Sequence, residues 1–155
     1  IGSHTDCGVF VQSKLYEQTV NHVYCSGLPI SYNYDSIQDV NLWDGLAELF
    51  LDAMYENTLI VSCMNNATNN TNAPCYLTKI GGGVFSMKHS QIIKAIQRAC
   101  QKIANAGISL DVKIVHYRNV DVGYDSILVS YPNPMLDMGS VWDDPKWIKS
   151  YSVLR

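Results

Sequence analysis

The apolar positions between residues 42 and 64 follow a helical period. They recur at i, i+4, i+7 and i+8 and form one stripe of residues, Leu42, Leu46, Leu49, Phe50, Ala53 and Met54. That spacing predicts a long helix that continues to about Met64. Asn41 precedes the stripe and Asp44 follows three residues later, which resembles a capping box with Asp in place of Glu. Five Asn within residues 65–72 then predict a turn, because Asn favours turns over helix interiors.

A strand, a helix and a second strand follow. Residues 75–80 have a strand pattern that ends at three consecutive glycines, and Ser86 is a candidate cap for the next helix. One face of that helix is apolar, formed by Ile92, Ile93, Ile96, Ala99, Cys100 and Ile103. Gly107 lies just past its end, where a left-handed residue is favoured, and residues 110–117 form the next strand. The sequence therefore predicts an α/β fold with a βαβ unit at 75–117, in which the strands are parallel and the crossover is right-handed.

The two ends of the chain carry weaker patterns. Residues 1–18 show no clear period, whereas residues 19–26 favour a strand, and residues 126–131 are compatible with another. The remainder is rich in Pro, Asp and aromatic residues, including Trp142 and Trp147. We therefore expect one domain over residues 1–132 and an irregular tail over 133–155, which packs on the body or docks a partner.

Composition narrows the class of protein. Apolar residues make up 47% and charged residues 16% of 155, a balance that excludes a disordered chain. The net charge is -3 and no basic stripe is present, so no nucleic-acid partner is expected. No stretch approaches about 20 apolar residues, and no charged segment with an apolar core opens the chain, so we expect neither a membrane span nor a secretion signal. The chain begins with Ile1, which hints at processing or at a fragment of a longer protein.

The cysteines and histidines do not form a recognisable site. Five cysteines at widely separated positions have neither disulfide nor zinc spacing, and the four histidines are dispersed. This pattern predicts reduced, mostly buried thiols in a cytoplasmic protein, and no metal site.

The strongest candidate for chemistry is the glycine segment between the strand and the helix. Backbone N–H groups are free at a helix start, the helix dipole is positive there, and glycines let a phosphate approach the backbone. The alternative is a tight turn, for which one glycine would suffice. The segment lacks the G-x-x-x-x-G-K-[ST] pattern of a P-loop, and Ser86 stands where a dinucleotide fingerprint needs its third glycine. A nicotinamide cofactor is therefore disfavoured.

Three segments together resemble a known family. Residues 24–32 (YCSGLPISY), 55–59 (YENTL) and 77–85 (LTKIGGGVF) are similar to a divergent branch of macrodomains, and residues 1–6 (IGSHTD) resemble a short motif that precedes this region. That branch contains the macrodomain ADP-ribosyl hydrolases of the bacterial-effector type and their eukaryotic relatives. The resemblance covers roughly residues 1–120. It implies a three-layer α/β/α fold that binds ADP-ribose as a ligand, without a cofactor, and that removes ADP-ribose from modified proteins by hydrolysis.

The resemblance also assigns roles by position. It implies that the backbone amides of Gly83, Val84 and Phe85 hold the diphosphate. Gly81 and Gly82 would let the distal ribose come close, beside Ser86 in a place where many relatives have glycine. Tyr117 would lie near the adenine or its ribose, and Asp6 is the candidate catalytic acid.

The resemblance leaves the first loop of the family without a counterpart here. We therefore expect this chain to be the C-terminal part of a larger domain, whose remainder is an upstream segment or another chain. Two alternatives to a hydrolase stay open. The first is a non-catalytic reader of ADP-ribose or of another nucleotide, and the second is a structural or interaction module whose tail docks a partner.

Overall fold

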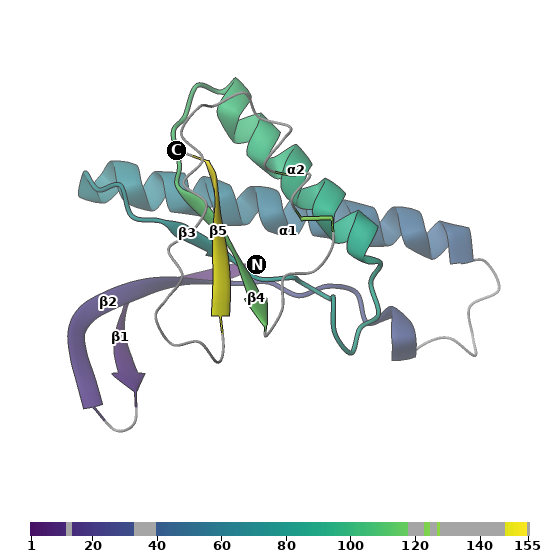
Figure 1. The fold of residues 1–155 in the computed structure, drawn as a ribbon, viewed down its shortest axis with the longest axis horizontal. Coiled ribbons are helices and arrows are strands. Elements are labelled where there is room, and N and C mark those ends of the chain that lie inside the picture. Colours follow the sequence, from purple (N-terminus) through teal and green to yellow (C-terminus); the bar gives the residue numbers. More distant parts are fainter. Residues whose placement is uncertain (12–13, 33–39, 118–122, 125–126, 128–147, 155) are drawn as a thin grey trace.

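The computed structural model describes residues 1–11, 14–32, 40–117, 123–124, 127 and 148–154. These residues form an α/β architecture with two helices and two small sheets (Figure 1). The elements in chain order are β1 (Gly2–Val11), β2 (Lys14–Tyr24), α1 (Val40–Asn69), β3 (Cys75–Leu77), α2 (His89–Asn105), β4 (Val112–Tyr117) and β5 (Ile148–Leu154).

The predicted βαβ unit is present. Strand β3 pairs in parallel with β4, with Cys75 opposite Val112 and Leu77 opposite Ile114, and α2 connects the two strands. Strand β5 pairs antiparallel with β4 on its other side, so the sheet is mixed, with the order β3-β4-β5. The expected irregular tail thus contains a strand, because residues 148–154 complete the sheet. Residues 133–147 and, apart from Ile127, the expected strand at 126–131 lie outside the described residues.

Helix α2 begins later than predicted and ends as predicted. Its N-cap is Lys88 and not Ser86, which has a φ of 57° in the left-handed region and cannot start a helix there. At the other end Gly107 has a φ of 71°, its N–H bonds the Ala104 carbonyl at 2.9 Å, and the N–H of Ile108 bonds the Ile103 carbonyl at 3.2 Å. This pair of hydrogen bonds is a Schellman motif, which explains why a glycine follows the helix.

Helix α1 extends further than predicted at both ends. It begins at Val40, before Asn41, so Asn41 lies inside the helix and does not cap it. It also runs through residues 65–69, where the Asn content predicted a turn. The helix ends only at Asn69, Asn70 after it adopts a φ of 50°, and the Asn66 side chain bonds Thr71 and Ala73 beyond the helix. The Asn66 side chain therefore holds the chain that follows, the Asn66 carbonyl oxygen accepts the N–H of Thr71 at 2.9 Å, and the Asn residues do not break the helix earlier.

The core lies on a different face of α1 from the predicted stripe. Ala47, Leu51, Tyr55 and Leu59 are fully buried at four-residue spacing. The predicted stripe is largely on the outside, since Leu49 is 63% and Leu46 is 39% exposed. The core is completed by residues of α2 and of the sheet, including Ile92, Ala95, Ile96, Cys100, Leu77, Val112 and Ile114.

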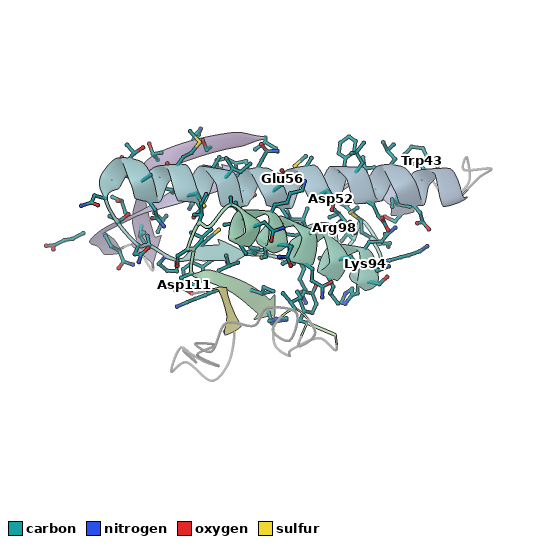
Figure 2. All side chains as sticks on the ribbon, turned by 90° about the horizontal axis from the view of Figure 1, so that it is seen from above. Trp43, Asp52, Glu56, Lys94, Arg98 and Asp111 are labelled. Atoms are coloured by element: carbon teal, nitrogen blue, oxygen red, sulfur yellow. The ribbon has the colours of Figure 1, made fainter. Side chains whose placement is uncertain are left out.

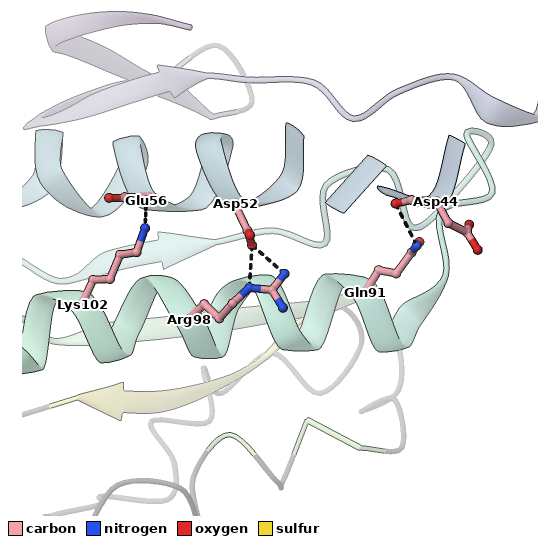
Figure 3. Close-up of polar contacts among 6 residues, drawn as sticks. All are labelled: Asp44, Asp52, Glu56, Gln91, Arg98 and Lys102. Carbon is pink, nitrogen blue, oxygen red and sulfur yellow. Dashed lines mark hydrogen bonds and ion pairs between the residues drawn. The ribbon is translucent and has the colours of Figure 1, made fainter. Parts of the chain in front are cut away.

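A ridge of polar contacts joins the two helices (Figures 2 and 3). The Asp52 carboxylate accepts hydrogen bonds from Arg98 Nε at 2.9 Å and Nη2 at 2.7 Å. Glu56, four residues further along α1, pairs with Lys102, four residues further along α2. These side chains are partly exposed, so each pair contributes only about 0.2–1 kcal/mol to stability.

Strands β1 and β2 form a hairpin that extends away from the helices (Figure 1). The first strand was not predicted, and Asp6 provides the reason. It has a φ of 53°, lies where the pairing register shifts between His4 and Cys7, and thereby breaks the alternation of side chains. None of the hairpin side chains that the structure describes is buried.

Candidate functional site

The glycine loop, residues 78–88, connects the carboxyl end of β3 to the start of α2. Gly81 has a φ of 73°, and its carbonyl oxygen accepts the N–H of Met87 at 3.0 Å, which closes the loop on itself. Ligands of α/β proteins bind at this edge of a parallel sheet, so the loop lies where the sequence placed the candidate site.

Tyr55 of α1 holds the beginning of the loop. Its hydroxyl donates to the Thr78 carbonyl oxygen at 2.9 Å and accepts the N–H of Ile80 at 2.9 Å. The Tyr55 side chain is fully buried, and this burial raises the pKa of the phenol well above its ordinary value. The hydroxyl therefore stays protonated and can serve both backbone partners at once. No sequence signal points to this role, because a tyrosine on the buried face of a helix has the same pattern as any core aromatic.

Ser31, which precedes α1, donates hydrogen bonds to two carbonyl groups at the tip of the glycine loop. The Ser31 hydroxyl donates to the Val84 carbonyl oxygen at 2.5 Å, and the Ser31 amide donates to the Phe85 carbonyl oxygen at 3.4 Å. The Gly83 carbonyl oxygen accepts the N–H of Ser86 at 3.0 Å. Because the C=O and N–H of a trans peptide point in opposite directions, the amides of Val84 and Phe85 point away from these partners.

Three consecutive amides at the tip have no hydrogen-bond partner among the described residues. The N–H groups of Gly83, Val84 and Phe85 donate no hydrogen bond to any other described residue. Val84 is 71% exposed, so these donors are open to solvent and to a ligand. The loop can therefore offer a row of backbone donors to an anion.

The three glycines of the loop differ in how much space the protein leaves for a side chain at each position. A Cβ on Gly81 would lie 2.3 Å from Met87 Sδ, and a Cβ on Gly82 would lie 3.2 Å from Ile92 Cδ1. Packing inside the protein thus accounts for Gly81, whose φ also requires it, and largely for Gly82. A Cβ on Gly83 would meet no atom within 4 Å, so the lack of a side chain there has no internal cause.

Charge at the start of α2 is modest. The N-cap Lys88 makes no side-chain cap hydrogen bond, and its ammonium group pairs with the Asp44 carboxylate of α1. No acidic residue occupies the first turn of α2. The positive end of the helix dipole is therefore opposed by no carboxylate on its own first turn.

The remaining predicted site residues are dispersed. Tyr117 is the last residue of β4, at the same edge of the sheet as the glycine loop, and pairs with Ile148. Asp6 lies on the hairpin, where its N–H bonds Asn21 Oδ1 at 2.9 Å, and no described contact joins it to the glycine loop. The carboxylate that the structure does bring to the end of the loop is Asp44, which the sequence indicated only as a helix-start residue.

A shallow open pocket of about 420 Å³ lies beside the loop and not on it. It is lined by Ile1, Tyr24, Cys25, Ser26, Gly27, Leu28, Phe50 and Met54. Gly27 links the two regions, since a Cβ on it would lie 3.0 Å from Gly81 Cα.

The five thiols are free, as predicted. The prediction that most of them are buried is wrong, because only Cys75 and Cys100 are buried. Burial raises the pKa of Cys75 to about 11 and that of Cys100 to about 12. Among the residues that the structure describes, no three His, Cys, Asp or Glu gather as metal ligands. Neither described helix combines the length and apolar character that a membrane crossing needs.

Comparison of the chain with protein-family models, with curated proteins and with solved structures finds no match.

Proposed function

We propose that this chain binds ADP-ribose through its glycine loop, and that it belongs to the macrodomain class that the sequence segments resemble. The observation that carries the proposal is the row of three unpartnered amides of Gly83, Val84 and Phe85. Backbone donors in a row suit a diphosphate, which offers several acceptor oxygens and two negative charges. The placement of the loop between a parallel strand and a helix start supports the same ligand chemistry.

Removal of ADP-ribose from proteins is the activity we propose for that binding. In such a reaction the loop would fix the diphosphate and present the distal ribose bond, and a carboxylate would orient the attacking water. Asp6 stays the candidate from the resemblance, and Asp44 is the candidate from proximity to the loop. Asp6→Asn and Asp44→Asn, assayed on an ADP-ribosylated protein, distinguish them. Binding without turnover would instead support a non-catalytic reader.

Titration calorimetry with ADP-ribose tests the binding step, with AMP as the control ligand. We expect Gly83→Val to weaken ADP-ribose binding at least tenfold, because the new side chain occupies open space beside the free amides. Gly83→Ala, a smaller change at the same position, has Gly45→Ala in α1 as its matched control. Both add one methyl group where nothing lies within 4 Å, and only the first should change affinity. No binding of ADP-ribose by the wild-type chain would overturn the proposal.

A further inference from the structure

Helix α1 carries a second apolar stripe that the described structure covers only in part, at Phe50, which lines the open pocket together with residues 24–28. The outer stripe consists of Trp43, Leu46, Phe50, Ala53, Ile60 and Met64. Leu46, Phe50 and Ile60 are 39%, 37% and 39% exposed, and Met64 is 62% exposed. The opposite face of the same helix is packed in the core. A helix that is apolar on both faces is normally buried on both, so the outer stripe needs a partner.

The spacing of the outer stripe indicates what kind of partner fits. Its members, with Asn57 in the middle, follow one another at intervals of 3, 4, 3, 4, 3 and 4 residues. This is the a/d pattern of three heptads, which packs against another helix by knobs into holes. The single polar member, Asn57, donates its side-chain N–H to the Ala53 carbonyl oxygen at 2.7 Å, so the amide is partly satisfied within its own helix.

The outer stripe is complementary to a second copy of itself. It contains no charged residue, so two copies would not repel each other. The one charged flanking side chain, Glu56, is already paired with Lys102 of the same chain. Ala53 lies at the centre and larger side chains lie on both sides, which lets two helices approach closely at the middle and interdigitate toward the ends.

The area is sufficient for a weak dimer. The exposed parts of Leu46, Phe50, Ile60 and Met64, with Leu49 that flanks the outer stripe, amount to on the order of 500 Å² per copy, so a symmetric pair would bury up to about 1,000 Å². That area is near the lower limit for a specific interface, so we expect the self-association to be weak. Because the flanks lack Lys and Arg, a second protein helix fits the outer stripe better than an anionic lipid surface does.

We propose that the outer stripe of α1 docks onto the same stripe of a second copy, forming a helix-to-helix homodimer. This inference does not depend on ADP-ribose binding. It rests on the heptad spacing, the exposure of the stripe and the absence of charge along it.

Sedimentation velocity of the chain from about 1 to about 200 µM tests the proposal, since that span brackets a micromolar dissociation constant. We expect a concentration-dependent shift from monomer to dimer. Ile60→Glu should weaken self-association at least tenfold. Ile108→Glu places the same change at a similarly exposed isoleucine outside α1, and should leave it unchanged.

Leu49→Glu keeps the test decisive if Ile60→Glu fails to fold, because Leu49 flanks the outer stripe and is 63% exposed. Circular dichroism checks that each variant is folded. A wild-type chain that stays monomeric throughout the range would overturn the proposal. So would a dimer that survives Leu49→Glu and Ile60→Glu as well as it survives Ile108→Glu.

Discussion

The hydroxyl of Tyr55 accepts the N–H of Ile80 at 2.9 Å, and this contact ties the long helix α1 to the first residues of the glycine loop. The same hydroxyl donates to the carbonyl oxygen of Thr78. One buried side chain thus satisfies two backbone groups on either side of Lys79, and fixes the path by which the chain leaves β3.

Tyr55→Phe should loosen the loop while preserving the core. The ring remains, but the Thr78 carbonyl oxygen and the Ile80 N–H lose the hydroxyl and keep only their 3.0 Å hydrogen bond to each other, so we expect a loss of about 0.5–1.5 kcal/mol. Hydrogen exchange should become faster at Ile80 and at Met87. Thr58→Val removes another hydroxyl from the same helix, one that bonds only Met54 and contacts Cys25 at 4.0 Å, and should leave the loop amides unchanged. Equal hydrogen-exchange rates at these amides in the two variants would contradict the role of the Tyr55 hydroxyl in holding the loop.

Gly81 and Gly83 should respond differently to alanine. Gly81→Ala places a Cβ against Met87 and forces a left-handed φ, so it should cost at least about 1 kcal/mol of stability. Gly83→Ala meets no atom within 4 Å and should stay within about 0.5 kcal/mol of wild type. Urea denaturation of the two variants measures the difference. Equal losses would show that Gly83 also has a structural role.

Ser86→Gly should stabilise the chain. Ser86 has a φ of 57°, where a side chain costs about 1–2 kcal/mol, and glycine returns part of that gain through the entropy of the unfolded chain. We expect a net increase of about 0.5–1 kcal/mol in the free energy of unfolding, seen as a higher urea midpoint with an unchanged slope. Ser90→Gly, in the first turn of α2, is the matched control and should lower the midpoint instead.

Stability should fall in mildly alkaline solution. The pKa of the Cys75 thiol is raised to about 11 and that of Cys100 to about 12 from an ordinary 9.0, because burial disfavours the thiolate. The folded chain therefore holds these protons more tightly than the unfolded chain. Their contribution to stability is complete below pH 9 and is lost as the pH rises toward 11–12.

The expected slope is up to about 1.4 kcal/mol per pH unit for each thiol. Urea denaturation in a phosphine reductant between about pH 7 and about 10.5 covers the start of this loss. Cys100→Ala lowers the overall stability by leaving a cavity, yet should give a shallower decline with pH. A decline as steep as that of the wild type would show that Cys100 is not one of the groups responsible.

The parts of the fold that were predicted are those set by local periodicity. Helix α2, its glycine C-terminus and the parallel pairing of β3 with β4 follow from a 3.6-residue period between two short strand patterns. The first strand was missed because the irregular backbone at Asp6 breaks its alternation. The end of α1 was missed because Asn66 bonds residues beyond the helix, which no count of turn-forming residues can indicate.

The candidate site was predictable only in position. Three glycines after a strand locate the loop, but the residues that shape it come from elsewhere in the chain. Ser31 and Tyr55 lie 53 and 23 residues away from their partners, Val84 and Thr78. The choice of the buried face of α1 also needed the structure, since both of its stripes are apolar and periodicity cannot distinguish them.

The close packing of Gly27, Gly81 and Met87 has a consequence for how this sequence can change. A Cβ at Gly27 would lie 2.5 Å from Met87 Sδ and one at Gly81 would lie 2.3 Å from the same atom. A side chain at Gly27 would therefore have to displace the buried Met87 thioether, and it would also meet the Cα atom of Gly81 at 3.0 Å. Substitutions at these three positions should therefore be non-additive, so that which residues are tolerated at one position depends on the residues present at the other two.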